Sequence, residues 1–252
     1  MDVLRMVQSL TFIEYIRSLL GILAFILIFI VALPFIFLIS ILFMGRGANF
    51  IMKFVAPLIA RPVMAIIGIK YSIVQHGEPF DKPAVYLINH SSTLDIPSMM
   101  AVGIPNIRFI AKWELQYFPF FFIAGRLTGQ VFIKRQNSEE AIQTLQKTYT
   151  RLKKNNLSVM VAPEGSRKHE GVIGPFKKGA FRMAIDLGYP IVPIYFEGND
   201  KLSLGGSIMA KSGIVNAHIH PPIDTSSWEI ETLPEHIAEV RSLYLGWAGV
   251  KE

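Results

Sequence analysis

A long uncharged stretch near the N-terminus constrains this chain more than any other feature. No charged residue occurs over 18–45, and Leu, Ile, Phe, Val and Ala fill nearly every position. This length and composition are typical of a helix that lies in a bilayer. A cleaved signal peptide fits poorly, because the stretch is too long and because Asp2 and Glu14 dilute the positive charge before it. We therefore expect a membrane-embedded N-terminal segment.

Pro34 lies near the middle of this stretch, where its missing N–H group and its ring favour a kink. Two geometries follow: one tilted helix that spans the bilayer, or two half-helices that enter one leaflet and return. Basic residues flank both sides, so the positive-inside rule does not choose an orientation. The next segment, 49–68, carries Lys53 and Arg61, and we expect an interfacial helix with both side chains at headgroup level.

The charge of the chain indicates what it binds. A net charge of +6 and a pI near 9.5 suit an anionic membrane surface and a phosphate-bearing substrate. Nucleic acid would be attracted by the same charge, but the cations accompany apolar helices and not an arginine-rich helix, so we expect membrane lipids and no nucleic acid. The chain has no cysteine, which excludes disulfides, thiolate nucleophiles and cysteine-based zinc sites.

Beyond Gly68, short β-rich runs alternate with helical segments, which predicts an α/β domain. The expected strands are 69–74, 84–88, 107–111, 130–133, 157–162, 191–196 and 214–220, the last near the margin of the sheet. We expect helices from Ser138, over 176–187, and from Thr232, where Glu235 three residues later indicates a capping box. The predicted fold is a mostly mixed sheet flanked by helices over 69–252, preceded by membrane-associated helices over 1–68.

Polar residues that would be costly in a core follow the predicted strand 84–88, at a strand end where α/β folds place their sites. This run begins at Asn89 and includes His90 and Asp95. An aspartate bonded to one imidazole nitrogen fixes the tautomer, and the other nitrogen can then take a proton from a hydroxyl. A His and an Asp five residues apart also occur by chance, in capping or solvated roles. Ser91 and Ser92 raise the alternative of a Ser-His-Asp hydrolase, but the chain contains no G-x-S-x-G elbow.

Charged residues also follow two other predicted strands. Lys134 and Arg135 end the strand 130–133, where on their own they are only two surface cations. A tight loop after the strand 157–162 contains Glu164, Gly165, Ser166 and Arg167. An arginine there can bind phosphate in bidentate fashion, while the glutamate can accept from a glycerol hydroxyl or hold the arginine.

The chain resembles the glycerolipid acyltransferase family in four blocks, which read NHSSTLD, GQVFIKR, APEGSR and VPI in this order. The likeness covers about 71–196 and includes the linking stretches KWEL and FKKGA. The H-x4-D block alone is unspecific, whereas the four together are highly specific. Bacterial members of the family include 1-acylglycerol-3-phosphate acyltransferases. The resemblance implies acyl transfer from acyl-CoA or acyl-carrier protein to the sn-2 hydroxyl of lysophosphatidate, which yields phosphatidate for phospholipid synthesis.

The resemblance also implies roles for single residues. His90 corresponds to the general base and Asp95 to its orienting partner. The glycerol phosphate of the acceptor would be bound by Arg135, Glu164, Gly165 and Arg167, with Lys134 and Ser166 beside them. The family often has Phe before PEG and Thr after it, whereas this chain has Ala162 and Ser166. These differences bear on acceptor preference and not on the reaction.

Neither a metal nor another cofactor is expected. His218 and His220 alternate on a predicted strand, but two histidines without a nearby carboxylate make a poor metal site. The aromatic run 117–122 is interpreted mainly as core, and alternatively as an apolar slot for the acyl chain or a membrane-facing patch.

Two other functions remain open. The same fold could act on glycerol-3-phosphate, another lysophospholipid or a lyso-aminolipid. A membrane lipid-binding protein without turnover would instead be expected to lack the His or the Asp of the first block, and both are present. We expect the chain at the inner, cytoplasmic membrane, with its catalytic domain on the cytoplasmic side.

Overall fold

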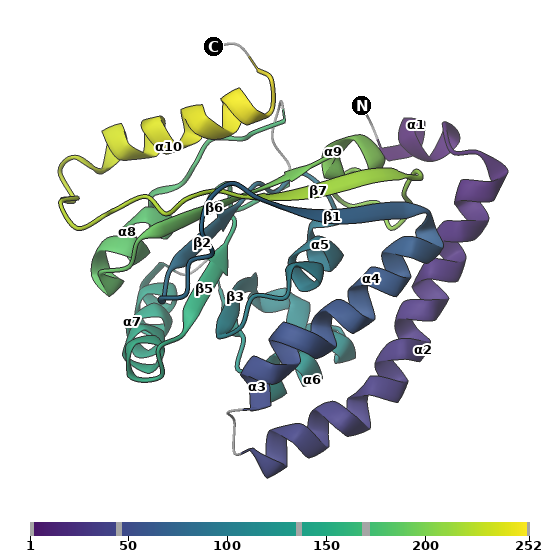
Figure 1. Ribbon diagram of the computed structural model, residues 1–252, viewed down its shortest axis with the longest axis horizontal. Coiled ribbons are helices and arrows are strands. Elements are labelled where there is room, and N and C mark those ends of the chain that lie inside the picture. Colours follow the sequence, from purple (N-terminus) through teal and green to yellow (C-terminus); the bar gives the residue numbers. More distant parts are fainter. Residues whose placement is uncertain (1–2, 44–46, 135–137, 168–171, 251–252) are drawn as a thin grey trace.

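A twisted mixed sheet forms the centre of the protein (Figure 1). The computed structural model describes residues 3–43, 47–134, 138–167 and 172–250. Its strands are β1 (Ile69–Gln75), β2 (Val85–Ile88), β3 (Ile107–Lys112), β4 (Val131–Ile133), β5 (Ser158–Val161), β6 (Ile191–Glu197) and β7 (Gly213–Ile219). Within the described residues they form one sheet in the order β1-β7-β6-β2-β5-β3-β4. The predicted α/β fold is therefore confirmed.

The direction of the strands decides where the site lies. β6, β2, β5, β3 and β4 are parallel neighbours, so all five end at one edge of the sheet. β7 pairs antiparallel with β6, and β1 pairs parallel with β7. All the predicted strands are present with ends shifted by one residue at most, and β7 lies near the margin as predicted, beside the edge strand β1.

Helices cover both faces of the sheet because its central strands are apolar on both faces. On β2, Val85 and Leu87 pack toward α7 (Ser138–Lys154), α8 (Lys178–Leu187) and α10 (Leu233–Trp247). Tyr86 and Ile88 pack on the opposite face, toward α4 (Ala56–Ile67) and α5 (Asp95–Val102). All four side chains of this strand are buried, as expected for the centre of a parallel sheet.

Two predicted helix starts need correction. α8 begins at Lys178 and not at 176, because Phe176 is buried in the preceding loop and Lys177 is the N-cap with an extended backbone. α10 begins at Leu233, but Thr232 does not form the predicted capping box. Its hydroxyl instead donates to the carbonyl of Glu229, 3.3 Å away.

Several short helices were not predicted from the sequence. α6 (Pro119–Thr128) forms from the aromatic run, after a 3-10 turn at Trp113–Tyr117, and α9 (Asn199–Leu202) follows β6. The chain begins with α1 (Val3–Gln8). Two of these elements, the 3-10 turn at Trp113–Tyr117 and α9, each directly follow a strand that ends at the edge shared by the five parallel strands.

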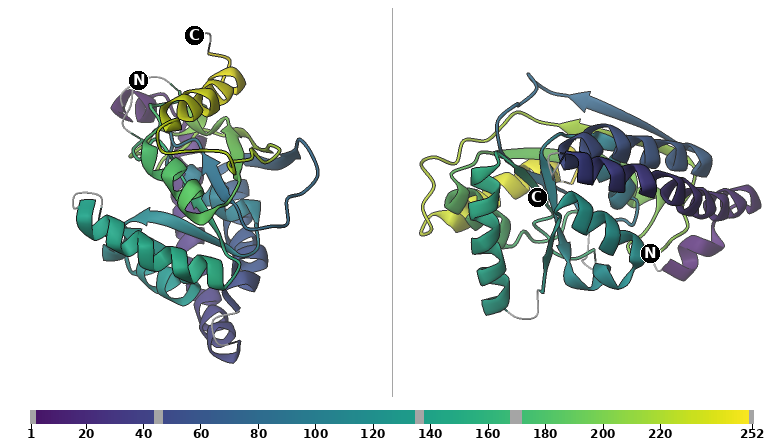
Figure 2. Two further views of the ribbon diagram at one scale, coloured as in Figure 1. Left: turned by 90° about the vertical axis from the view of Figure 1, so that its left-hand side faces the viewer. Right: turned by 90° about the horizontal axis from the view of Figure 1, so that it is seen from below.

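The apolar N-terminal stretch is one helix, α2 (Phe12–Leu42), which continues through Pro34. The predicted pair of half-helices divided at Pro34 is therefore not seen. The chain returns through α3 (Gly47–Phe50), a π-helical turn at Ile51–Val55 and α4, which lies alongside α2 (Figures 1 and 2). Both α2 and the segment Gly47–Ile67 are long and apolar enough to cross a membrane.

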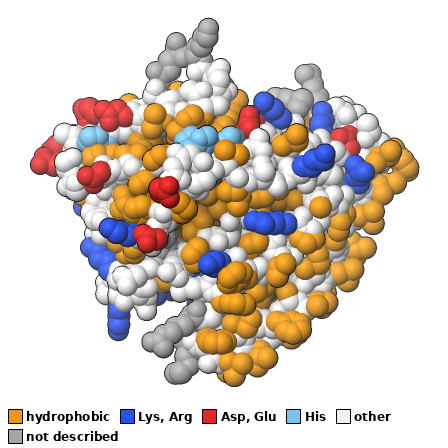
Figure 3. Space-filling model, in the orientation of Figure 1, with side chains coloured by type: hydrophobic (Ala, Val, Ile, Leu, Met, Phe, Trp, Pro, Cys, Tyr) orange, Lys and Arg blue, Asp and Glu red, His pale blue; other side chains and the backbone are white. Residues whose placement is uncertain are grey.

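The two helices form a hairpin that packs closely between its two arms, while one face of α2 stays uncovered. A Cβ atom at Gly21 of α2 would lie 2.5 Å from the Ile67 side chain, so the absence of a side chain lets the helices approach closely. Phe29 and Ile36 of α2 are buried against the second helix. The outer face of α2 is apolar and exposed, and it forms the continuous hydrophobic band at the right of Figure 3.

The second helix is half buried, and Lys53 and Arg61 are both exposed, so its predicted place at the membrane interface stays a prediction. Arg61 donates from Nε and Nη2 to the carbonyl of Ala101 near the end of α5, at 3.2 and 2.9 Å. The hairpin is also fixed to the rest of the protein. The Ser18 hydroxyl bonds the backbone of Ala210, and Glu14 accepts from the N–H of Ser212.

Candidate active site

The candidate site lies where the parallel strands end. Asn89 and His90 follow β2, Glu164 and Arg167 follow β5, and Asn199 follows β6. Because these strands are parallel neighbours, the residues converge at one edge although up to 110 positions separate them in the sequence, from Asn89 to Asn199. The first and third predicted blocks thus meet in space, together with a residue that follows the fourth, as expected for the carboxyl edge of an α/β sheet.

His90 and Asp95 are directly bonded. Nδ1 of His90 lies 2.8 Å from Oδ2 of Asp95. The side chain of Asp95 is fully buried, whereas 22% of the His90 side chain is exposed, so the imidazole can meet a substrate and the carboxylate cannot. With Nδ1 held by the carboxylate, Nε2 is the basic nitrogen of the ring. This is the arrangement that the sequence predicted.

Two further groups hold the Asp95 carboxylate, and a third holds one of them. The backbone N–H of Ser92 donates to Oδ2 at 3.0 Å, and the side-chain amide of Asn199 donates to Oδ1 at 2.8 Å. Asn199 is itself held by the Ser98 hydroxyl, which donates to its Oδ1 at 3.2 Å. Asn199 and Ser98 are fully buried. The carboxylate therefore has hydrogen-bond partners on both oxygens, and its position relative to His90 is fixed.

The backbone around His90 is held by two other buried side chains. Asn89 accepts from the N–H of Phe196 at 2.7 Å and donates to its carbonyl at 3.1 Å, so it continues the pairing of β2 with β6 beyond the strand end. Glu164 accepts from the N–H of His90 at 2.7 Å and from the N–H of Gly174 at 3.0 Å. Glu164 therefore holds the backbone of His90 in place, whether or not it also contacts a substrate.

Arg167 lies beside the first block. Its Nη1 donates to the hydroxyl of Thr93, 3.2 Å away, and its side chain packs on Gly205, where a Cβ atom would lie 2.6 Å from that of the arginine. The Thr93 hydroxyl also accepts from the N–H of Gly206 at 3.2 Å. No carboxylate is within salt-bridge distance of Arg167 among the described residues. Its charge is thus directed to the same edge as His90.

The remaining predicted binding residues lie in the same region or outside the described residues. Gly165 has a φ of +69°, a conformation that glycine adopts without strain, and Ser166 is exposed. Nζ of Lys134 lies 5.0 Å from the centre of the Trp113 ring, in a cation–π contact. Arg135 falls outside the described residues.

Sequence reasoning missed the residues that support the site from a distance. Asn199 stands beyond the fourth block, and a single polar residue after a strand gives no local signal of a partner 104 positions away. From α10, Arg241 donates to the carbonyls of Ile173 and Gly174, and Tyr244 donates to the carbonyl of Leu87. Only the tertiary fold brings these groups to the ends of β2 and β5.

Neither serine of the first block is placed as a nucleophile. Ser92 accepts from the N–H of Leu94 through its hydroxyl at 3.1 Å, which stabilises the turn into α5. The Ser91 hydroxyl oxygen is buried, and it has no hydrogen-bond partner in the described part of the chain. The geometry therefore favours direct transfer with His90 as base over a Ser-His-Asp arrangement.

His218 and His220 do share a face, together with His76. His76 and His220 stack with ring centres 4.4 Å apart, and Nε2 of His76 lies 2.8 Å from Nδ1 of His218. The sequence missed Glu197, whose carboxylate lies 3.2 Å from Nε2 of His218. Within the described ranges, no group of three or more His, Asp or Glu side chains is arranged to hold a metal ion.

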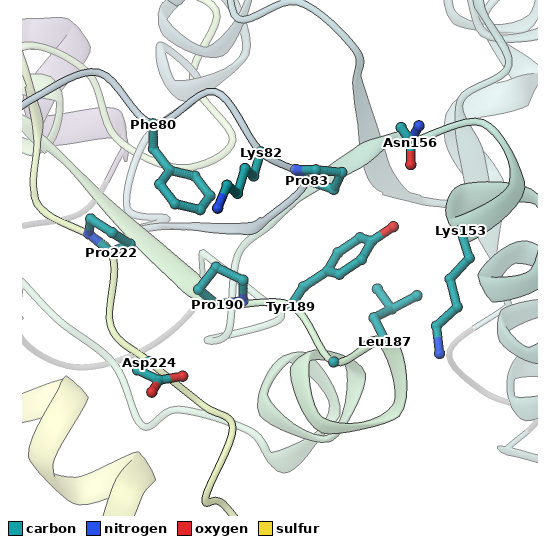
Figure 4. Close-up of a pocket in the computed structure, with 11 residues that line it drawn as sticks. Phe80, Lys82, Pro83, Lys153, Asn156, Leu187, Tyr189, Pro190, Pro222 and Asp224 are labelled. Atoms are coloured by element: carbon teal, nitrogen blue, oxygen red, sulfur yellow. The ribbon is translucent and has the colours of Figure 1, made fainter.

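A hollow of the molecule lies at the opposite edge of the sheet (Figure 4). It measures about 690 Å³ and is lined by residues that precede strands, such as Pro83, Asn156 and Pro190. Phe80 and Tyr189 supply aromatic rings, and Lys82 one of its cations. None of the predicted site residues in the described part of the chain lines it, so it is separate from the His90 edge.

Comparisons with known proteins agree with the four blocks. A family model described as acyltransferase matches residues 70–197. The 1-acyl-sn-glycerol-3-phosphate acyltransferase of Haemophilus influenzae is 32% identical over 168 residues, which cover 65% of this chain and 68% of that protein. The enzyme of that name from Saccharomyces cerevisiae is 33% identical over 178 residues, which cover 70% of this chain and 59% of that protein.

A solved structure is similar over nearly the whole chain. It is the crystal structure of the 1-acyl-sn-glycerophosphate (LPA) acyltransferase PlsC from Thermotoga maritima, with a TM-score of 0.74 and 25% sequence identity. The superposition covers 95% of this chain and 99% of that one, the N-terminal helices included. By sequence, the chain spans less than two thirds of several curated relatives, such as 65% of the Limnanthes douglasii protein.

Proposed function

Because the chain belongs to the acyltransferase family, we propose that it transfers a fatty acyl group from a thioester donor to the sn-2 hydroxyl of lysophosphatidate. The product would be phosphatidate, a precursor of phospholipids. The observation that carries this proposal is the His90–Asp95 pair, with an exposed imidazole, a buried and fully held carboxylate, and Arg167 at the same edge.

The proposed reaction is a direct transfer. The acceptor hydroxyl attacks the thioester carbonyl while Nε2 of His90 takes its proton, and the buried Asp95 carboxylate stabilises the imidazolium that forms. When the tetrahedral intermediate collapses, the C–S bond breaks and the thiolate of the donor leaves. The proton on His90 then neutralises the thiolate, so the base is restored without an acyl-enzyme.

We propose that the loop after β5 receives the acceptor's phosphate. Arg167 has a hydrogen bond to the neutral hydroxyl of Thr93, and a phosphate would give it a stronger, charge-assisted partner. The positive φ of Gly165 turns the chain tightly between Glu164 and Ser166, so that the arginine follows the buried glutamate directly. Lys134, and Arg135 after it, would add positive charge from the end of β4.

The aromatic run is partly packed and partly exposed. Phe120 packs edge-on against Phe25 and Phe29 of α2, with ring centres 4.6 and 4.3 Å apart, which fixes α6 to the hairpin. Tyr117 and Phe118 are exposed, at 76% and 60%. We propose that the exposed aromatic side chains face the lipid, so that the acyl chains of donor and acceptor need not leave an apolar environment.

The exposed apolar face of α2 suggests membrane association. We propose an inner-membrane location with the sheet on the cytoplasmic side, where thioester donors are made. Replacing Leu23, Leu27 and Ile30 on that face by Ser should shift the protein from the membrane fraction toward the soluble one. Deleting α2 would be a poorer test, because the deletion exposes the apolar side chains of Ile51 and Ile59 that it covers.

Lipid product analysis tests the proposed reaction. Purified protein in detergent is given one acyl donor and either lysophosphatidate, glycerol-3-phosphate, lysophosphatidylethanolamine or a lyso-aminolipid. We expect phosphatidate as the main product, and none from the His90→Ala variant. Preferential acylation of another acceptor would refute the proposed substrate but not the reaction, whereas folded protein that acylates none of them would refute both and favour a lipid-binding role.

A further inference from the structure

A second hollow lies at the outer edge of the sheet, between α6, β4 and α7, and none of the described residues assigned to acyl transfer lines it. It measures about 360 Å³. Trp113 and Gln116 line it at the carboxyl end of β3, which places this part beside the catalytic edge. Arg126, Lys147 and Arg151 line the rest. The hollow therefore extends from the edge that carries the site along the last strand of the sheet.

The described lining of the hollow is positively charged. Among the described residues, it contains three cations and no acidic residue. Behind the hollow, the buried side chain of Arg108 and the side chain of Arg151 both lie next to Gly129. A Cβ atom on Gly129 would lie 3.6 Å from Nε of Arg108 and 3.7 Å from Nη1 of Arg151. Burial, and in second place the charge of Arg151, lowers the pKa of Arg108 to about 10.

The hydrogen bonds of these two arginines do not offset their charge. Arg108 donates to the carbonyl of Ile107 and to the side chain of Asn49, and Arg151 donates to the carbonyl of Gly129. All these acceptors are neutral. Two guanidiniums held close together by neutral acceptors make a local excess of positive charge, which an anionic ligand would compensate.

A polar group in the lining also points to a ligand. Nε2 of the Gln116 side chain is buried and has no hydrogen-bond partner in the part of the chain that the structure describes. A buried amide without a partner loses the hydrogen bond that it would make with water, so such groups are usually satisfied by a ligand or an ordered water. Trp113 beside it provides an aromatic ring of the kind on which nucleobases stack.

We propose that this hollow binds the nucleotide of a coenzyme A thioester, and that it is thus the docking site of the acyl donor. The inference rests on the proposed acyl transfer and names its donor. The cations Arg126, Lys147 and Arg151 bind the phosphates, and Trp113 and Gln116 contact the base. A concave site with one indole and three cations fits a small nucleoside bisphosphate better than the broad acidic surface of a carrier protein.

The edge strand β4 connects this site to the reaction centre. β4 pairs with β3 on one side and has no strand partner on the other among the described residues. The arm that joins the nucleotide to the thioester contains two amides, and such groups can bond the outer backbone of an edge strand. An arm that follows β4 in chain direction reaches the edge where His90 lies.

Charge reversal on α7 tests the proposal. Lys147→Glu lies in the hollow, and Lys154→Glu makes the same charge change on the same exposed helix but outside the lining. KM is measured with lysophosphatidate and either palmitoyl-CoA or palmitoyl-pantetheine, which lacks the nucleotide. We expect Lys147→Glu to raise KM for palmitoyl-CoA about tenfold or more, with KM for palmitoyl-pantetheine unchanged and with Lys154→Glu near wild type. Arg126→Glu, from another helix, should repeat the effect.

Direct binding decides the inference independently of turnover. Adenosine 3′,5′-bisphosphate should bind the wild-type protein in calorimetry and compete with palmitoyl-CoA, and Lys147→Glu should weaken its binding while Lys154→Glu does not. Equal effects of the two variants, absent nucleotide binding, or use of acyl-carrier protein as the only donor would overturn the inference and leave the proposed acyl transfer intact. Nucleotide binding without any acyl transfer would instead refute the proposed function alone.

Discussion

The two edges formed by the parallel strands differ in how their polar groups are held. At the carboxyl edge, Asn89, Asp95, Glu164 and Asn199 are buried and bonded to one another or to the backbone, whereas the His90 imidazole reaches solvent. At the amino edge, the larger hollow is lined by prolines, aromatic rings and exposed lysines (Figure 4). The size of a hollow therefore does not locate chemistry here; the arrangement of buried hydrogen bonds does.

This difference follows from backbone geometry. At the carboxyl ends of parallel strands the chain turns into helix N-termini, whose N–H groups and loops can hold carboxylates. Here the turn into α5 places the Ser92 N–H on Asp95, and the loop after β5 places Glu164 on the His90 N–H. Variants at both edges test whether function is confined to one of them.

Loss of the base should have the largest effect. In His90→Ala, turnover with lysophosphatidate should fall by ~10²–10⁴, because a general base typically contributes that much, while acceptor binding largely persists. Lys82→Ala at the amino edge is the matched control, and its turnover should stay within about twofold of wild type. If the two variants lose turnover equally, the contrast between the edges is not functional.

The next effect should appear in acceptor binding. Arg167→Ala removes a charge-assisted contact worth roughly 1.5–3 kcal/mol, so KM for lysophosphatidate should rise by about ten- to a hundredfold with a smaller change in kcat. Arg182→Ala, which removes an arginine paired with Asp186 on the surface of α8, is the control for loss of a positive charge. A fall in kcat at unchanged KM would show that Arg167 serves the chemical step instead.

A smaller loss is expected for the residue that the sequence did not reveal. Asn199→Ala removes the donor to Oδ1 of Asp95, and we expect kcat to fall by about tenfold at unchanged KM, since the base persists but its partner is less well held. Asn199→Gln should not restore kcat, because its longer side chain does not fit the buried site. A kcat–pH profile of Asn199→Ala that is displaced from that of wild type would support a positioning role for Asn199. An unchanged kcat would contradict it.

The fold was predictable to the extent that it rests on local pattern. The strands follow from apolar runs with turn residues between them, and His90 and Asp95 are close in sequence, so their bond was a short-range inference. The role of Asn199 was not predictable, because it depends on which strand lies beside β2. Arg61 was expected at headgroup level, and its bond to the Ala101 carbonyl follows from the packing of two helices that the sequence does not place relative to each other.

The two edges also differ in their histidines. His90 lies at the carboxyl edge, whereas the cluster of His76, His218 and His220 lies toward the amino edge. β7 runs antiparallel to β6, so His220 follows it at the edge away from His90, and its N–H donates to the Pro193 carbonyl. His220 stacks on Trp247 with ring centres 3.6 Å apart, and its Nε2 is buried without a hydrogen-bond partner among the described residues. Burial, with the nearby His76 and His218, lowers the pKa of His220 to about 4.

The smallest predicted effect is therefore on stability and not on turnover. An unfolded histidine has a pKa near ~6.5, so between about pH 6.5 and 4 the unfolded chain binds a proton at this position that the folded chain does not. Stability should thus fall as the pH is lowered through this window. His220→Phe keeps a ring on Trp247 but cannot titrate, so its midpoint of thermal unfolding in detergent should drop less than that of wild type between pH 7.5 and 5. Lysophosphatidate acylation at pH 7.5 should be unchanged in this variant, and an equal acid sensitivity of the two proteins would contradict the assignment of the low pKa to this ring.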